Sequence, residues 1–373
     1  MLEKYAHLLI HYCVELKAGE KLYVSTTTLA EPLVRALYET ATKLGAVMEV
    51  DFSFEGQDAI LYAHADDFVL SHLPVLKAKA ISEYDAYIYI KAPYDLNATR
   101  GMDMQKKQTR SQALSGINEA YYERTADRSQ PGALKRSLCQ YPTPAAAAAA
   151  DMSLEDYADF VFTACHLHAD DPQGEWLKVR AQQQKIKEYL DGVDQVRYKA
   201  DHTDVSFSVK GRTWINSDGQ TNMPSGEVYS GPVEDSVNGK VHFTFPSIYM
   251  GQDVKGITLW VEQGEVVRWE AEQGKELLDA VFEIPGARYF GEVAIGTNYQ
   301  IQRATRNILF DEKIGGTIHM AVGQAYKQTG GTNQSSIHWD MITDMSESGE
   351  IWADGKLIYE KGQFLISVME DAS

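Results

Sequence analysis

The sequence has few cysteines and none of the common phosphate-binding loops. Its 373 residues include only Cys13, Cys139 and Cys165, and no two of them form a CxxC pair. An odd, widely spaced set excludes a disulfide scaffold or a thiolate zinc finger and fits a reducing compartment. No GxGxxG motif follows the first expected strand, and neither GxxxxGK[ST] nor GxSxG occurs. A nucleotide cradle and an α/β-hydrolase nucleophile are therefore not expected.

Basic residues and long apolar runs are also scarce. The sequence contains 35 lysines and arginines and 53 acidic residues, which gives a formal net charge of −18. This balance disfavours nucleic acids and anionic membrane surfaces as partners. The alanine run 145–150 is far too short for a membrane span, and the first residues lack the pattern of a secretory leader. We expect a cytoplasmic protein that binds neither nucleic acid nor membrane.

The length of the chain favours two domains, and the pattern of expected secondary structure changes near residue 191. The first half alternates expected strands with expected helices, which predicts a parallel sheet covered by helices. The strands are expected at 21–25, 46–54 and 85–91 and the helices at 31–44, 67–79 and 103–128. Short β-type runs separated by Gly, Asn, Asp and Pro then predict antiparallel sheets. We expect an α/β domain over 1–191 and a β-rich α+β domain over 192–373.

Five ionisable residues of the second half lie in segments that are otherwise poor in charge. Glu227 and Glu292 each follow a glycine, His319 lies among apolar residues, and His338 and Asp340 form a His-x-Asp pair. In a strand, residues two apart share a face. Each residue alone has an ordinary explanation: an exposed loop acid, a core histidine or a hydrogen-bonded pair. Together they supply what two divalent ions require, and burying them without metal would be costly.

Several segments resemble the thermophilic-type metallo-aminopeptidases, peptidase family M29, and the resemblance covers nearly the whole chain. The segments are 222–239 (NMPSGEVYSGPVEDSVNG), 285–288 (PGAR) with 291–292 (GE), 309–312 (LFDE), 319–326 (HMAVGQAY) and 337–340 (IHWD). The chain reads DEKI at 311–314, where many longer members have DENA. This difference indicates a distinct, shorter subgroup similar to leucyl aminopeptidases.

The resemblance implies an α/β domain followed by a β-rich domain that carries a dinuclear metal site. It implies two ions per subunit, Zn, Co, Mn or Mg, one of whose ligand carboxylates, Glu292 or Asp340, bridges them. The implied ligands are Glu227, Glu292, His319, His338 and Asp340. Tyr326, seven residues after His319, matches the catalytic tyrosine, and Glu227 is a candidate general base. The expected protein is a homodimeric aminopeptidase acting on peptides with a free amino terminus.

Two alternatives remain at this point. His319, His338 and Asp340 also compose the facial triad of a mononuclear non-haem Fe(II) enzyme. Some proteins of this fold resemble ring-cleaving dihydroxypyridine dioxygenases. The presence of Glu227 and Glu292 favours the peptidase, since these two residues serve as ligands for a second metal. The other alternative is a non-catalytic relative, which would be indicated by loss of a ligand or of Tyr326, and none is missing.

Overall fold

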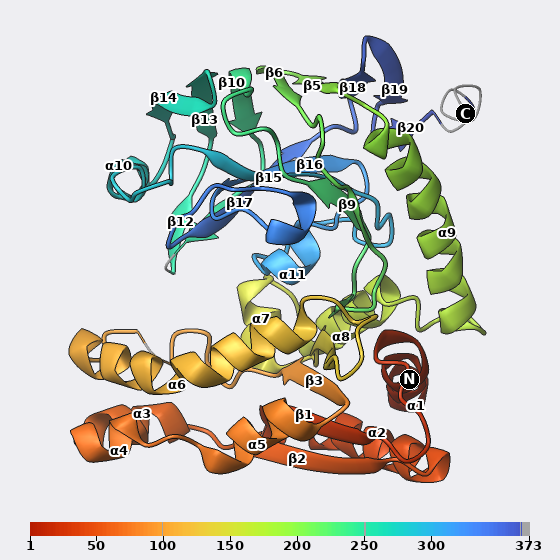
Figure 1. The fold of residues 1–373 in the computed structure, drawn as a ribbon, viewed down its shortest axis with the longest axis vertical. Coiled ribbons are helices and arrows are strands. Elements are labelled where there is room, and N and C mark those ends of the chain that lie inside the picture. Colours follow the sequence, from red (N-terminus) through yellow and green to blue (C-terminus); the bar gives the residue numbers. More distant parts are fainter. Residues whose placement is uncertain (99, 250, 366, 368–373) are drawn as a thin grey trace. The chain divides into compact units, whose positions relative to one another are not determined.

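The computed structural model describes residues 1–98, 100–249, 251–365 and 367, and they form two compact units (Figure 1). The first unit comprises Met1–Gln173 and Gly219–Pro224, and the second comprises Gly174–Asp218 and the chain from Ser225 onward. The long helix α9 (Pro172–Asp191) therefore lies mostly in the second unit, whereas we expected the boundary after it. The reason is packing, because Ile186 and Leu190 are buried in the core of the second unit.

The first unit contains the expected parallel sheet. Its strands run in the order β2-β1-β3-β4-β8, and every neighbouring pair is parallel. The strands are β1 (Lys21–Thr27), β2 (Val47–Ser53), β3 (Ala86–Lys91), β4 (Lys135–Gln140) and β8 (Asn222–Met223). This confirms the α/β character of the first half, although β4 and β8 were not among the expected strands.

Helices connect these strands. They are α1 (Leu2–His7), the π-helix η1 (Leu8–Cys13), η2 (Thr28–Ala30), α2 (Glu31–Leu44), α3 (Gln57–His64), α4 (Asp67–Ser71), α5 (Val75–Glu83), α6 (Met104–Thr125), α7 (Pro144–Ala149) and α8 (Leu154–Ala164). Helix α2 matches the expected range 31–44 and ends at Gly45, which adopts a φ of +80°. The single helix expected at 67–79 is wrong. It is split before Pro74, whose ring prevents a continuous helical ladder.

The second unit contains two large antiparallel sheets, as the short β-type runs in its sequence predicted. One has the order β14-β13-β10-β6-β5-β18-β19-β20 and the other β17-β16-β15-β9-β7, with a small β11-β12 pair beside them. The strands are β5 (Gln195–Ala200), β6 (Thr203–Ser208), β7 (Ile215–Ser217), β9 (Glu227–Ser230), β10 (Asn238–Phe243), β11 (Ser247–Tyr249), β12 (Gln252–Val254), β13 (Ile257–Glu262), β14 (Glu265–Glu270), β15 (Phe290–Gly296), β16 (Thr317–Gly323), β17 (His338–Asp344), β18 (Glu350–Ala353), β19 (Lys356–Glu360) and β20 (Gln363–Phe364). The helices besides α9 are α10 (Lys275–Val281), α11 (Ile308–Asp311) and the 3₁₀ turn η3 (Lys327–Thr329).

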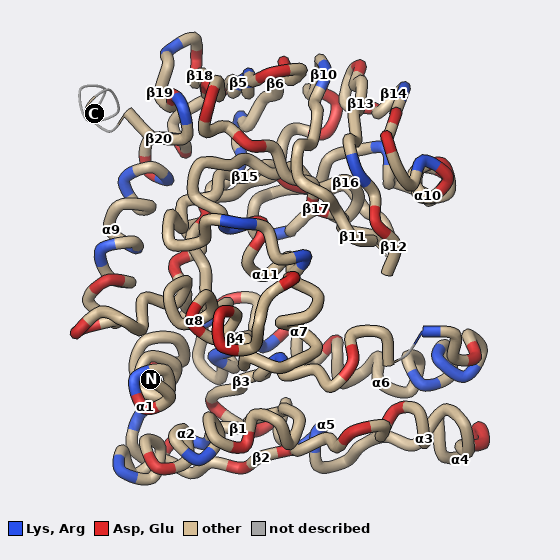
Figure 2. Tube along the Cα trace, turned by 180° about the vertical axis from the view of Figure 1, so that it is seen from behind, with Lys and Arg blue, Asp and Glu red and all other residues tan. Residues whose placement is uncertain are grey.

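A single apolar core joins the two sheets and α9 within the second unit. Every residue of β15 and of β16 is buried, so any ionisable side chain on these strands is held away from water. Acidic residues, red in Figure 2, are spread over elements of both units. Within the described part of the chain, no helix combines the length and the apolar character needed to cross a membrane.

Candidate metal centre

The five-stranded sheet of the second unit carries all five expected ligands on one face. Glu292 on β15 is paired with Ala321 on β16, which is paired in turn with Asp340 on β17. Directly opposed residues of antiparallel strands point to the same side. His319 and His338 lie two residues from Ala321 and Asp340, so the pleat brings their side chains to this side too.

Glu227 joins this face from the next strand. It begins β9 and is paired with Gly296, four residues after Glu292 on β15. The preceding Gly226 has a φ of +114°, and a Cβ there would lie only 2.8 Å from the Cβ of Asn298. The buried side-chain amide of Gln183 on α9 donates to the backbone carbonyl of Glu227, at 3.0 Å. The position of β9 at the site therefore depends on the turn at Gly226 and on the hydrogen bond from helix α9.

The donor atoms of these residues lie at the spacing expected for ligands of shared ions. His319 Nε2 is 3.4 Å from Glu227 Oε2 and 3.5 Å from Glu292 Oε1. His338 Nε2 is 3.0 Å from Glu292 Oε2 and 3.4 Å from Asp340 Oδ1. Two donors about 2.0–2.1 Å from a tetrahedral ion are roughly 3.3 Å apart. The two oxygens of Glu292 face different histidines.

Several donor atoms at the centre are buried without a hydrogen-bond partner. Among the described residues these include Glu227 Oε2, Asp340 Oδ1 and both ring nitrogens of His319. Leaving a buried polar atom unsatisfied costs about 1–3 kcal/mol. Three groups of potential ligands have donor atoms within 4.8 Å of one another: Glu227 with Glu292 and His319; Glu292 with His338 and Asp340; and Glu312 with His319 and Asp340. The residues therefore fit divalent metal ions, which would satisfy these atoms.

Glu312 and Lys313 also belong to the centre, and the sequence interpretation gave them no role. Lys313 is completely buried, with its Nζ 2.9 Å from Glu227 Oε1 and also ion-paired with Glu312. The segment reaches the sheet because Gly296 has no side chain, and a Cβ there would lie 2.1 Å from the carbonyl oxygen of Ile314. The available signal was the charged run 311–313 directly before a charge-poor strand.

Mutual attraction between the histidines and carboxylates determines the protonation of the metal-free centre. Burial alone would lower the histidine pKa values, but the carboxylates outweigh it. They raise the pKa of His319 to about 9 and that of His338 to about 11. Burial likewise opposes ionisation of Asp340, yet His338 holds the pKa of Asp340 at about 2. Burial raises the pKa of Glu312 to about 8, against the effect of Lys313. The acidic cluster thus attracts positive charge, whether protons or metal ions.

A hydrogen bond to the backbone fixes the ring of His338. Its Nδ1 lies 2.7 Å from the carbonyl oxygen of Gln324, which can only accept, so Nδ1–H is the donor. Nε2 consequently points to Glu292 and Asp340. This orientation by a backbone carbonyl is typical of histidines that bind metals.

Tyr326 lies at the mouth of the centre, three residues after the end of β16. Its ring centroid is 4.8 Å from that of His338 and 5.7 Å from that of Tyr229, and 40% of the residue is exposed. Shielding from water raises the pKa of Tyr326, and the carboxylates of Glu292 and Asp340 raise it further. The hydroxyl therefore keeps its proton at neutral pH and can donate a hydrogen bond.

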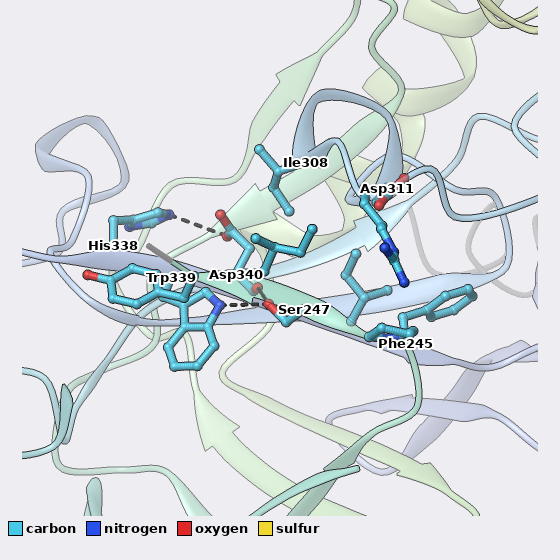
Figure 3. Close-up of a pocket in the computed structure, with 12 residues that line it drawn as sticks. Phe245, Ser247, Ile308, Asp311, His338, Trp339 and Asp340 are labelled. Atoms are coloured by element: carbon cyan, nitrogen blue, oxygen red, sulfur yellow. Dashed lines mark hydrogen bonds and ion pairs between the residues drawn. The ribbon is translucent and has the colours of Figure 1, made fainter. Parts of the chain in front are cut away.

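A cavity of about 150 Å³ adjoins the centre (Figure 3). His338 and Asp340 lie at one end in this view, and Phe245 and Asp311 at the other. Its lining residues are Phe245, Pro246, Ser247, Ile248, Tyr249, Arg306, Ile308, Asp311, His338, Trp339, Asp340 and Ile342. The indole of Trp339 donates to Ser247 Oγ at 2.7 Å, which ties β17 to the segment that forms the wall of the cavity.

Known proteins match the whole chain. The model of the thermophilic metalloprotease family (M29) matches residues 1–364. Aminopeptidase 2 from Geobacillus stearothermophilus is 29% identical, and aminopeptidase AmpS from Bacillus subtilis is 25% identical, each match covering 95% of both chains. The solved structure of wild-type AmpT from Thermus thermophilus aligns over 98% of both chains with a TM-score of 0.84 and 24% identity. This structural similarity confirms the expected fold.

Proposed function

Because the chain belongs to the thermophilic metalloprotease family M29, as its motifs predicted, we propose that it is a metal-dependent aminopeptidase. Its substrates are peptides with a free amino terminus, in line with the names of its relatives. The observation that carries the proposal is the set of buried donor atoms on Glu227, His319 and Asp340 that have no hydrogen-bond partner among the described residues. They are placed for divalent ions, and ordinary hydrogen bonding does not account for them.

We assign two divalent ions, Zn, Co, Mn or Mg, to this centre. Glu227 and His319 would hold one, His338 and Asp340 would hold the other, and Glu292 would bridge them. Such a pair supplies Lewis-acid polarisation of the scissile carbonyl and a water of lowered pKa. Glu292 is preferred over Asp340 as the bridge because its two oxygens face the two histidines.

The protein's own residues then perform three tasks. The Tyr326 hydroxyl donates a hydrogen bond to the oxyanion that develops on the substrate carbonyl. The unpartnered Oε2 of Glu227 accepts the proton of the attacking water, while Lys313 holds Oε1 in place. The carboxylate-rich centre attracts the positively charged amino group of the substrate, which restricts cleavage to the first residue.

The cavity beside His338 and Asp340 receives the side chain of that first residue. Phe245, Ile308 and Ile342 contribute apolar surface to its wall. This apolar part of the wall selects by size and hydrophobicity. We therefore propose a preference for aliphatic first residues such as leucine.

The test is reconstitution of chelated, dialysed protein. Co²⁺, Zn²⁺, Mn²⁺ or Mg²⁺ is added separately, and hydrolysis of leucine p-nitroanilide is compared with that of its N-acetylated analogue. We expect metal-dependent release of nitroaniline from the free-amine substrate alone. Absence of hydrolysis with every metal would leave a non-catalytic relative as the better description. Dimerisation and a cytoplasmic location stay predictions, the former measurable by light scattering.

The Fe(II) dioxygenase alternative is not supported. Its triad requires His319, His338 and Asp340 around one ion, but no ligand group among the described residues contains both histidines. Each histidine is instead grouped with carboxylates, and Glu292 stands between the two rings. That arrangement suits two ions better than one.

A further inference from the structure

Lys313 places a permanent positive charge inside the centre. Its side chain is fully buried, and its ammonium contacts Glu227 and Glu312. The backbone is also held, because Lys313 N–H donates to Phe310 at 3.0 Å and its carbonyl accepts from the N–H of Asn298 at 2.9 Å. A buried charge of this kind persists only when it is paired. The ammonium is therefore a fixed component of the centre.

The direct contacts of this charge lie on one side of the centre. Glu227 and Glu312 occur only in ligand groups that contain His319, which we name the His319 position. Glu292, His338 and Asp340 form the His338 position, and Glu292 and Asp340 each also belong to one group that contains His319. In the described part of the chain, the ion pairs of Glu292 and Asp340 are with histidines alone. Lys313 thus contacts two carboxylates of the His319 position directly, whereas it acts on Asp340 of the His338 position only through space.

We propose that Lys313 is a positioning residue that makes the two metal positions unequal, with tight binding at the His338 position and weaker binding at the His319 position. This inference rests on the dinuclear centre of the proposed function. Glu292, as the proposed bridge, contributes to both positions, so its charge does not distinguish them. Asp340 adds one negative charge to the His338 position. Glu227 and Glu312 add at most two to the His319 position, where the ammonium offsets one of them and lies directly against both carboxylates. Lys313 also occupies one oxygen of each carboxylate, leaving fewer for a metal ion.

The consequence is a centre that keeps one ion and exchanges the other. The fixed ammonium repels a dication that shares its carboxylates, and in a partly buried site this repulsion is weakly screened. At the same time it orients Glu227, so that Oε2 is the oxygen left for the metal or for the water. Lys313 thereby allows the ion at the His319 position to exchange and also holds the carboxylate of Glu227 in one orientation.

The experiment is a Co²⁺ titration of metal-free, full-length protein, followed by the visible cobalt spectrum and by equilibrium dialysis. We expect the wild type to bind two ions in separate steps, the second at least tenfold more weakly. Lys313→Met removes the charge while keeping a similar length, and should tighten the second step at least tenfold, about 1.4 kcal/mol. Lys313→Arg should retain two unequal steps. Lys275→Met, which breaks an exposed ion pair with Asp279, is the matched control and should leave both steps unchanged.

Two equal steps in the wild type would overturn the inference, and so would weaker binding of both ions in a Lys313→Met protein that retains the wild-type circular dichroism spectrum. The wild-type titration decides the question even if the methionine variant does not fold. Leucine p-nitroanilide hydrolysis in the same samples separates the two proposals. If the protein hydrolyses the substrate but binds the two ions in equal steps, only the inference about Lys313 is wrong. If it neither binds metal nor hydrolyses the substrate, the proposed function is wrong as well.

Discussion

Replacement of the proposed bridging carboxylate, Glu292→Gln, is expected to affect the centre more than any other single change that the fold should tolerate. The glutamine has nearly the same size, so the buried strand β15 should keep its packing. The change removes a negative charge that lies 3.0 Å from His338 and 3.5 Å from His319. Since Glu292 belongs to two of the three ligand groups found among the described residues, both proposed ions would lose a ligand at once.

The magnitude follows from this double role. Loss of an outer-shell partner alone typically lowers metal affinity about 10–100-fold, so loss of a shared ligand should cost at least about 100-fold at each position. We expect at least one ion per subunit to be lost on dialysis. The value of kcat/KM should fall at least about 1,000-fold, which corresponds to roughly 4 kcal/mol of transition-state stabilisation.

The assay combines metal analysis of dialysed protein with leucine p-nitroanilide kinetics. Glu265→Gln is the control, because Glu265 lies on β14 in an exposed pair with Arg288, and it should behave as the wild type does. Circular dichroism checks that both variants are folded. Full activity with two retained ions in Glu292→Gln would refute the assignment of Glu292 as a bridging ligand.

Three further predictions concern the proposed catalytic tyrosine, the cavity, and the packing of the segment that carries Lys313 against β15. Tyr326→Phe should lower kcat about 100- to 1,000-fold with unchanged metal content, and unchanged kcat would remove its role as oxyanion donor. Phe245→Ala should lower kcat/KM for a leucine substrate about tenfold and leave an alanine substrate nearly unaffected; equal losses would show that the cavity does not bind the first side chain. Gly296→Ala should lower the free energy of unfolding by about 1–3 kcal/mol, because the new Cβ would meet the Ile314 carbonyl; an unchanged denaturant midpoint would contradict this.

The order of elements in the first unit was largely predictable because the β-branched and aromatic runs of β1 and β3 alternate with amphipathic helices. Strand β4 was not, since its sequence KRSLCQ begins with two charges and resembles a loop. It pairs with β3 and β8 in the sheet, and β8 comes from a distant part of the chain. The pairing of β4 with β8 is therefore visible only in the tertiary structure.

The candidate ligands were predictable because each charged residue interrupts a segment poor in charge. Glu312 and Lys313 were not assigned because adjacent opposite charges are typical of an exposed turn. Their burial depends on Gly296, which lies in another strand and allows the segment to approach the sheet. Apart from the charged run 311–313, the sequence neighbourhood of Lys313 therefore contains no sign that its ammonium lies among the candidate ligands.

The most direct test of the central claim is product analysis with a natural peptide substrate. A leucine-initiated peptide and its N-acetylated copy are incubated with the cobalt-reconstituted protein, with and without chelator, and the products are followed by mass spectrometry. The account predicts stepwise loss of residues from the free amino end, no cleavage of the acetylated copy and no cleavage with chelator. Internal cleavage, cleavage of the blocked peptide, or an intact free peptide in the presence of metal would contradict it.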